Sequence, residues 1–261
     1  HPEIEAFSRS NPRSKIVVIL TGTDIYPAAS ELSLHSMQMA DRLVVLQGKA
    51  IDRVPVEFHD KVQVIVQAVI PSRKSVTDKM KMNPEAFNVA VVANLRGVKD
   101  PFLAATAARL MPGESRLYVR HAGFPLDCGS DEHARKETAG NSRYEWLGGL
   151  NPADSRELIS RSDVLLVTSK NEGAGRVIGE AITDDTPVIA TRVEGITGLV
   201  GDDYAGLFPA GDAMALAALL TRVENNNGFL DELSQGCRRL APVFVPAVEV
   251  QSWKKLIAGL A

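Results

Sequence analysis

The residues best suited to chemistry lie in one short stretch, SKNEGAGRVIGEA (169–181). Glu172 and Glu180 stand on either side of Gly173 and Gly175, where an apolar run gives way to a helical pattern. A turn that enters a helix presents unpaired N–H groups, which bind anions or sugar oxygens. One ligand reaches both carboxylates only if it is long, because their interval would measure about 12 Å along a helix. The alternative is an acid in the first helical turn and an exposed helix residue.

A second turn carries two cations. In VVANLRGVKDP (91–101), Arg96 and Lys99 follow an apolar run and precede a helical pattern. Two such side chains beside a helix start could clamp a diphosphate. The alternative is a pair of solvated loop cations, whose contribution is small at a surface.

A third candidate lies at the end of the apolar run in RLYVRHAGFPLD (116–127). Gly123 either lets a ligand approach the backbone or makes a turn. For His121, a satisfied core or loop histidine is the more common role, and a catalyst the less common one.

A fourth candidate is ILTGTDIYP (19–27), where polar residues follow an apolar run. Thr21, Thr23 and Asp24 would face a cleft at a strand end. The alternative is a turn in which Asp and Thr side chains bond their own backbone.

Positioning these residues requires a particular fold. Short β-branched apolar runs alternate with helical patterns, and their continuous apolarity indicates strands covered on both faces, as in a parallel sheet. The alternation predicts a doubly wound α/β fold, in which ligands bind beyond the carboxyl ends of the strands. The expected strands are 15–23, 42–47, 62–69, 87–94, 116–123, 144–148, 163–169 and 186–192, and the expected helices are 101–111, 153–162, 175–182, 213–223 and 228–241.

The polar stretch PSRKSVTDKMKMNP (71–84) interrupts this rhythm and indicates an interdomain linker. We therefore predict two Rossmann-like domains, residues 1–83, which include most of the linker, and residues 84–245. The first has only three clear strands, so we expect its opening strand and Gly-rich loop to be missing. We expect residues 246–261 to form a helix that packs toward the first domain, with Val248, Trp253, Leu256 and Ile257 on one stripe.

Composition excludes several classes of function. The 261 residues carry 29 basic and 32 acidic side chains, which gives no electrostatic reason to expect nucleic acid or an anionic membrane. Two cysteines without a CxxC spacing favour a reducing cytoplasm over a disulfide or zinc framework. No apolar stretch approaches the ~20 residues of a membrane span. The first residues, HPEIEAFSRS, lack a charged region followed by an apolar one, so we do not expect them to be a signal peptide. No acidic pair follows a strand, so we expect no tightly held metal and no cofactor.

The motifs resemble a known family when they are taken in order. The cationic turn, the strand-end glycine, YEWLGGL and an E-x7-E spacing that enters a helix resemble the C-terminal domain of glycosyltransferase family 4. This resemblance implies the GT-B architecture, in which two Rossmann-like domains face a cleft. More closely, LTGTDIY, DRLVVLQ, NLRGVKDP, YEWLGGL, NEGAGRVIGEA and GDDYAGLFPAGD resemble the selenosugar synthases of selenoneine biosynthesis. That group is implied to join a sugar from UDP-GlcNAc or UDP-glucose to selenophosphate through a C–Se bond.

The resemblance also implies roles for residues. Arg96 and Lys99 would neutralise the donor diphosphate, Glu172 would bind sugar hydroxyls and Glu180 the ribose. The implied catalytic residues are Glu172, Lys99, Arg96 and Asp24. The implied donor-binding residues are Arg96, Lys99, Gly123, Leu147, Gly148, Glu172, Gly173, Ala174, Gly175 and Glu180, and the implied acceptor-binding residues are Thr21, Gly22, Thr23 and Asp24.

The chain departs from the family pattern in two places. Where the family commonly has G-R-L, this chain has Ala93-Asn94-Leu95, so Asn94 replaces an expected cation that Arg96 would have to supply. The Gly-rich loop after the first strand is not visible. The alternatives are an enzyme that makes an ordinary O-glycoside, a nucleotide-sugar-binding protein without catalysis, and a UDP-sugar epimerase.

Overall fold

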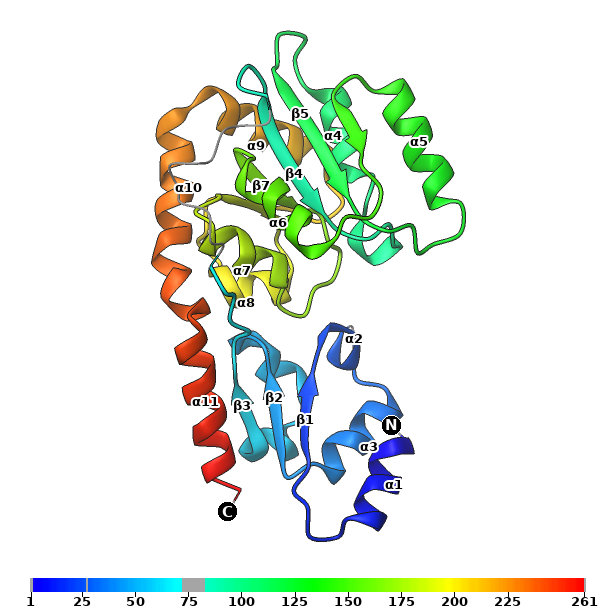
Figure 1. The fold of residues 1–261 in the computed structure, drawn as a ribbon, viewed down its shortest axis with the longest axis vertical. Coiled ribbons are helices and arrows are strands. Elements are labelled where there is room, and N and C mark those ends of the chain that lie inside the picture. Colours follow the sequence, from blue (N-terminus) through cyan, green and yellow to red (C-terminus); the bar gives the residue numbers. More distant parts are fainter. Residues whose placement is uncertain (1, 27, 72–82, 261) are drawn as a thin grey trace.

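The protein folds around two separate parallel β-sheets (Figure 1). The computed structural model describes residues 2–26, 28–71 and 83–260. The smaller sheet has the strand order β1-β2-β3 and the larger sheet the order β6-β5-β4-β7-β8-β9. The strands are β1 (Val17–Leu20), β2 (Arg42–Val45), β3 (Val62–Val64), β4 (Phe87–Val92), β5 (Leu117–Ala122), β6 (Tyr144–Trp146), β7 (Val164–Val167), β8 (Val188–Thr191) and β9 (Leu207–Phe208).

Helices connect successive strands, as a parallel sheet requires. Several begin at residues that cap their free N–H groups: Asn151 accepts a hydrogen bond from the Asp154 N–H at 2.9 Å, and Asp212 one from the Ala215 N–H at 2.9 Å. The helices are α1 (Pro2–Ser10), α2 (Gly22–Ile25), α3 (Glu31–Met39), α4 (Leu103–Leu110), α5 (Ser130–Gly140), α6 (Pro152–Ser160), α7 (Arg176–Thr183), α8 (Glu194–Val200), α9 (Ala213–Asn225), α10 (Asn227–Leu240) and α11 (Pro246–Ala258), with short 3-10 helices at Gly48–Arg53, Val56–Lys61, Gly97–Lys99 and Ala241–Phe244.

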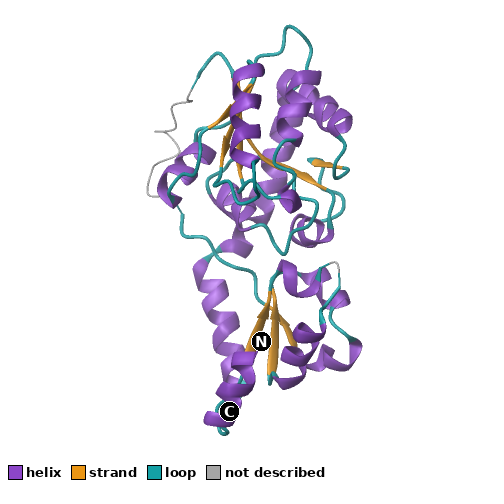
Figure 2. Cartoon of the chain, turned by 90° about the vertical axis from the view of Figure 1, so that its right-hand side faces the viewer, coloured by secondary structure: helices purple, strands orange, loops and turns teal. Residues whose placement is uncertain are grey.

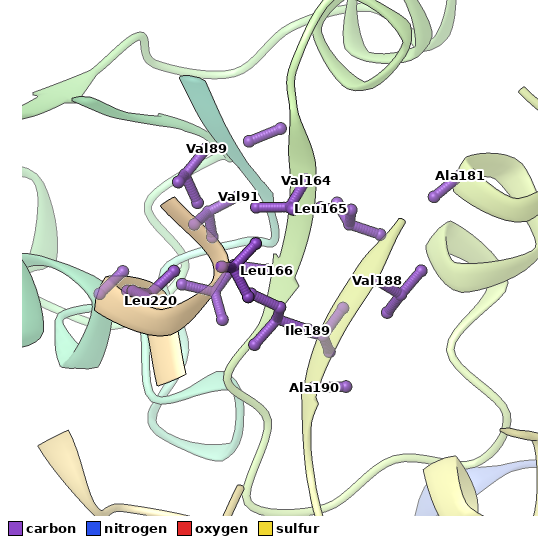
Figure 3. Packing of buried hydrophobic residues seen from close by; sticks show 14 of the residues in the cluster. Val89, Val91, Val164, Leu165, Leu166, Ala181, Val188, Ile189, Ala190 and Leu220 are labelled. Carbon is purple, nitrogen blue, oxygen red and sulfur yellow. The ribbon is translucent and has the colours of Figure 1, made fainter. Parts of the chain in front are cut away.

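The larger core lies on both faces of the larger sheet. Figure 3 shows its centre, where Val89 and Val91 of β4 and Leu166 of β7 lie near Leu220 of α9. All four side chains are almost fully buried. Coverage on both faces is the reason why these strands are continuously apolar in sequence.

The C-terminal helix α11 returns to the smaller sheet, and Figures 1 and 2 both show it alongside these strands. Leu256 packs with Val44 and Ile65 in a core of its own, and Trp253 packs against this core. The expected apolar stripe is partly wrong, since Val248 is 47% exposed and Ile257 is 61% exposed.

The chain therefore crosses between the two sheets twice. On the first crossing, Ile65 belongs to the core around the smaller sheet and Val69 to the larger core. On the second, Phe244 belongs to the larger core and Leu256 to the smaller. The Val69 N–H donates to the Phe244 carbonyl at 3.0 Å, so the two crossings lie side by side. The expected linker 71–84 falls mostly outside the described residues, and the domain boundaries stay a prediction.

Candidate functional site

The site is organised by one ion pair at the carboxyl ends of two neighbouring strands. Lys99 ends the 3-10 helix that follows β4, and Glu172 lies in the turn that follows β7. The Lys99 Nζ lies 2.5 Å from the Glu172 Oε2, which also accepts a hydrogen bond from the Ser169 hydroxyl at 2.9 Å. The side chains are 26% and 14% exposed. Both groups are therefore oriented and yet reachable from solvent.

Backbone contacts hold the two loops together. The Thr168 hydroxyl donates to the Lys99 carbonyl at 2.8 Å, and the Lys170 N–H donates to the Val98 carbonyl at 2.9 Å. These bonds fix the turn after β7 against the 3-10 helix after β4. The ion pair is thus a product of the sheet order, which places β4 beside β7.

The larger of two adjoining pockets, with a volume of about 350 Å³, opens on one side of this pair. Lys99, Glu172 and Gly175 line it, as the sequence predicts for donor-binding residues, and so does Gly123. Arg176, at the first position of α7, lines it as well. Two cations and one carboxylate therefore border this pocket.

The smaller pocket, of about 260 Å³, opens on the other side. Its wall combines Thr21, Gly22 and Thr23 from the end of β1 with Arg96 and Lys99, and it is completed by the turn after β7, which contributes Asn171, Glu172 and Gly173. Residues of the smaller-sheet part and of the larger-sheet part thus share one pocket. Lys99 and Glu172 line both pockets, so the two spaces meet at the ion pair.

Two glycines bring the two parts into contact at this pocket. A Cβ on Gly173 would lie 2.7 Å from the Gly22 N, and a Cβ on Gly22 would lie 3.0 Å from the Gly173 N. The close approach therefore requires the absence of a side chain on both residues. A third glycine, Gly195 in α8, supports the turn from behind, where its Cβ would lie 1.6 Å from the Glu172 carbonyl oxygen.

Comparison with known proteins assigns this arrangement to a family. Residues 73–240 match the family model described as glycosyl transferases group 1. The chain belongs to the group 1 glycosyltransferases. The match includes every part of the site that follows β4, β5 and β7, while Thr21 to Asp24 lie outside it.

Two curated relatives carry the same name. The D-inositol 3-phosphate glycosyltransferase of Saccharomonospora viridis is 30% identical over 242 residues, which are 85% of this chain and 54% of that protein. The protein of the same name from Salinispora arenicola is 34% identical over 193 residues, 70% of this chain and 42% of that protein. The chain thus spans about half the length of these relatives.

Solved structures share the fold. HepE of Anabaena, in complex with UDP and glucose, matches with a TM-score of 0.79 and 16% identity, over 99% of this chain and 76% of that chain. The pneumococcal O-GlcNAc transferase GtfA, in complex with UDP and GlcNAc, matches with a TM-score of 0.76 and 16% identity, over 98% of this chain and 54% of that chain. These likenesses confirm the predicted GT-B architecture.

Arg96 and Lys99, which the sequence grouped as a diphosphate clamp, separate in this group 1 glycosyltransferase. Arg96 lines the smaller pocket and not the larger one, whereas Lys99 lines both. The second cation of the larger pocket is Arg176, which sequence reasoning missed because it treated residues 175–182 only as a helical pattern. The Arg176 guanidinium lies 3.3 Å from Glu180, so the two form an ion pair one helical turn apart.

Four of the predicted donor-binding residues line neither described pocket: Leu147, Gly148, Ala174 and Glu180. Glu180 is nevertheless adjacent, through its ion pair with Arg176. The Gly148 carbonyl accepts a hydrogen bond from the Gly123 N–H at 2.8 Å, so it supports a glycine that does line the larger pocket. Their roles toward a ligand stay predictions.

His121 is a core residue of this glycosyltransferase. Its ring is buried, with Nδ1 2.8 Å from the Tyr144 hydroxyl and Nε2 2.9 Å from the Ala93 carbonyl oxygen. Burial lowers the pKa of His121 to about 4, because the interior disfavours the charged form. This is the satisfied core histidine that the sequence favoured.

Gly123 has a packing reason in addition to its place in the pocket. A Cβ there would lie 1.8 Å from the Ala93 carbonyl oxygen, so the ends of β4 and β5 approach closely only with glycine. The Trp146 indole donates to the Gly123 carbonyl at 3.0 Å. Gly123 thus lets the Ala93 backbone lie close beside it, and both residues line the larger pocket.

Asp24 is occupied by its own turn. Its Oδ2 accepts hydrogen bonds from the Thr21 N–H and the Thr21 hydroxyl, both at 2.7 Å. This is the local Asp/Thr turn that the sequence allowed as the alternative. Asp24 does not line the smaller pocket, whereas Thr21, Gly22 and Thr23 do.

Further contacts join the two parts beside the site. Lys49 Nζ lies 2.5 Å from Asp202 and 3.0 Å from the Thr197 hydroxyl, and Arg53 forms a bidentate pair with Glu194. These residues come from the 3-10 helix Gly48–Arg53 and from α8 with the turn that follows it. They hold α8, and through Gly195 the Glu172 turn, against the smaller-sheet part.

No helix in the described ranges 2–26, 28–71 and 83–260 is long and apolar enough to cross a membrane. Within the same ranges, no three His, Cys, Asp or Glu side chains gather in a way that could hold a metal ion.

Proposed function

We propose that this chain transfers a hexosyl group from a UDP-sugar, either UDP-GlcNAc or UDP-glucose, to selenophosphate. The observation that best supports a transfer reaction is that two pockets meet at Lys99 and Glu172. A transferase must hold two substrates against one reacting carbon, and two adjoining pockets with shared walls suit that task. The UDP and sugar complexes of HepE and GtfA support a UDP-sugar as donor.

The reaction exchanges one bond at the anomeric carbon for another. The bond from this carbon to the diphosphate oxygen breaks, and UDP departs with the electron pair. A lone pair of the acceptor selenium forms the new C–Se bond. Lys99 would stabilise the charge that grows on the departing diphosphate, because a positioned cation acts most strongly where charge develops.

The acceptor assignment rests on the nucleophile that the smaller pocket can serve. Among the described residues that line it, Glu172 is the one carboxylate, and it is paired with Lys99. Asp24 is bonded to Thr21 and His121 is buried, so neither is placed to remove a proton. An anionic selenium nucleophile needs little proton removal, which fits such a site. The resemblance of six segments to the selenosugar synthases supports the same acceptor.

The names of the curated relatives favour a second candidate, transfer to the hydroxyl of a phosphorylated cyclitol with formation of an ordinary O-glycoside. Incubation of the chain with each UDP-sugar and either selenophosphate or inositol 3-phosphate, followed by mass spectrometry, separates the two. A selenium-containing sugar is expected. A glycosylated inositol phosphate without any selenosugar would replace the first proposal with the second.

Two controls distinguish the remaining alternatives. UDP binding without release of UDP in the presence of any acceptor would indicate a nucleotide-sugar-binding protein. Interconversion of UDP-sugars without acceptor would indicate an epimerase.

We place the activity in the cytoplasm because Cys128 and Cys237 are both free thiols, which a reducing compartment preserves.

Binding of the nucleotide itself is tested at Glu180. If its carboxylate accepts the ribose hydroxyls, Glu180→Ala should weaken UDP binding about tenfold, the loss typical of a hydrogen bond to a charged group. Calorimetry with UDP measures this, with Glu232→Ala on the exposed side of α10 as the control. Unchanged UDP affinity in the Glu180 variant would remove the residue from the donor site.

A further inference from the structure

The smaller pocket contains a guanidinium without a counter-charge. Arg96 is exposed at its wall, and the structure shows no ion pair for its side chain within the described residues. The other cation of this pocket, Lys99, is neutralised by Glu172 at 2.5 Å. The pocket therefore has an uncompensated positive charge beside Thr21 and Thr23. The Thr21 hydroxyl already donates to Asp24, whereas the Thr23 hydroxyl can donate to a ligand.

We infer that Arg96 binds a phosphoryl group of the acceptor, and not the diphosphate of the donor. The inference rests on the proposed function and assigns the acceptor-recognising residue of that same site. The larger pocket already has two cations, Lys99 and Arg176, and Arg96 does not line it. Lys99 pairs with Glu172 and Arg176 with Glu180 in this structure, and a bound diphosphate would draw its counter-charges from these two cations without Arg96.

The chemistry of the smaller pocket fits a phosphoryl oxyanion. A guanidinium presents a planar fork of donors that binds phosphate oxygens in pairs. Selenophosphate and a phosphorylated cyclitol share a phosphoryl group, so the same residue would recognise either.

Calorimetry with two ligands tests the assignment. Inorganic phosphate is titrated into the chain saturated with UDP, and UDP is titrated separately. Arg96→Gln should lower phosphate affinity about tenfold, as loss of hydrogen bonds to a charged group does, and leave UDP affinity within twofold. The phosphate affinity of Arg96→Lys should lie between that of the unaltered chain and that of Arg96→Gln. Arg176→Gln should weaken UDP binding and leave phosphate binding unchanged, and Arg239→Gln on α10 is the control for a lost surface charge.

The outcomes separate this inference from the proposed function. Equal losses of UDP affinity in the Arg96 and Arg176 variants would overturn it, because Arg96 would then belong to the donor. Phosphate binding that is absent in the unaltered chain, or unchanged in Arg96→Gln, would overturn it too. A chain that binds phosphate through Arg96 without binding UDP would instead contradict the proposed function and leave the anion site standing.

A UDP-release assay then identifies the source of the phosphoryl group. The KM values for selenophosphate and for inositol 3-phosphate are compared in the unaltered chain and in Arg96→Gln. The acceptor that is turned over should show the rise in KM, with a smaller change in kcat, because Arg96 holds the acceptor and does not contact the departing UDP. An effect on kcat alone would contradict binding as the role of Arg96.

Discussion

Lys99 and Glu172 neutralise each other where the two pockets meet. A bound diphosphate would take over Lys99 and free the Glu172 carboxylate to accept hydrogen bonds from sugar hydroxyls. Before a ligand binds, the ion pair therefore gives each of the two charged groups a partner. The sequence hypothesis assigned Lys99 to the diphosphate and Glu172 to the sugar hydroxyls, and it did not predict that the two side chains pair with each other.

We expect Lys99→Met to lower the rate of UDP release about 100-fold, the cost of removing one group that stabilises transition-state charge. Lys170→Met is a close control, because Lys170 follows β7, pairs with Asp100 at 3.5 Å and lines neither described pocket. Steady-state assays of both variants measure the difference. Comparable losses of the UDP-release rate in the two variants would contradict a role for Lys99 that depends on its position in the pockets.

His121 makes stability depend on pH. The pKa of His121 is lowered from 6.5 to about 4 in the folded chain, so the unfolded chain binds more protons between these values. The free energy of unfolding should thus fall as the pH drops from 6.5 to 4, by about 3 kcal/mol from this residue. Urea unfolding across this range checks it, with His121→Gln expected to be less stable at pH 7 and to show a shallower slope. An equal slope in both proteins would contradict the assignment.

For single residues, the sequence predicted which side chains lie near the site, but not which hydrogen bonds and ion pairs each of them forms. Glu172, Lys99 and Thr23 do line the site. Asp24 does not, because the nearest donors for its carboxylate belong to its own turn. Arg176 was missed because a cation at the start of a helix looks like a solvated residue until the fold places it against a pocket.

Among the elements, α8 packs directly against the turn that contains Glu172. Gly195→Ala would put a methyl group 1.6 Å from the Glu172 carbonyl oxygen, so α8 or the turn must move. We expect lower thermal stability and weaker UDP binding together. Gly113→Ala is the matched control, since a Cβ there meets nothing within 4 Å. Thermal melts and UDP calorimetry on both variants decide this, and normal UDP affinity in Gly195→Ala would count against support of the turn.

Short length or the lack of an apolar stripe explains why the sequence did not predict some of the helices and strands. All eight expected strands form. Strands β4, β7 and β8 are buried almost throughout, which leaves a continuous apolar run, whereas Ile19 of β1 is 46% exposed. The strand β9 spans two residues and α8 seven, which is too short for a period to show. Helix α5, SDEHARKETAG, is mostly polar and buries few side chains, so it has no apolar stripe to detect.

For the molecule as a whole, charged contacts hold the smaller-sheet part against α8. The Arg53–Glu194 pair is bidentate, and each side chain is 41% exposed, so it should contribute about 0.5 kcal/mol. A double-mutant cycle with Arg53→Gln and Glu194→Gln, followed by urea unfolding, measures this coupling. It should shrink in 0.5 M salt, where screening shortens to a few ångströms. A coupling that does not respond to salt would argue against an ionic contact.

The sequence predicted the architecture of two sheets but not the contacts between them. Those contacts depend on pairs far apart in the chain, such as Gly22 with Gly173 and Lys49 with Asp202. Neither pair has a local pattern, since a loop glycine and a surface lysine occur in every protein. The sequence therefore predicted that Thr21 and Thr23 face a cleft, but not which residues of the larger-sheet part line the smaller pocket with them.

The hydrogen bond between the Val69 N–H and the Phe244 carbonyl ties the two crossings at one point, and the Ala68 N–H donates to Glu249 of α11 at 2.7 Å beside it. Two connections tied to each other restrict twisting of one part against the other more than a single connection would. Because residues of both parts line the smaller pocket, this constraint acts on the placement of Thr21 and Thr23 relative to Lys99.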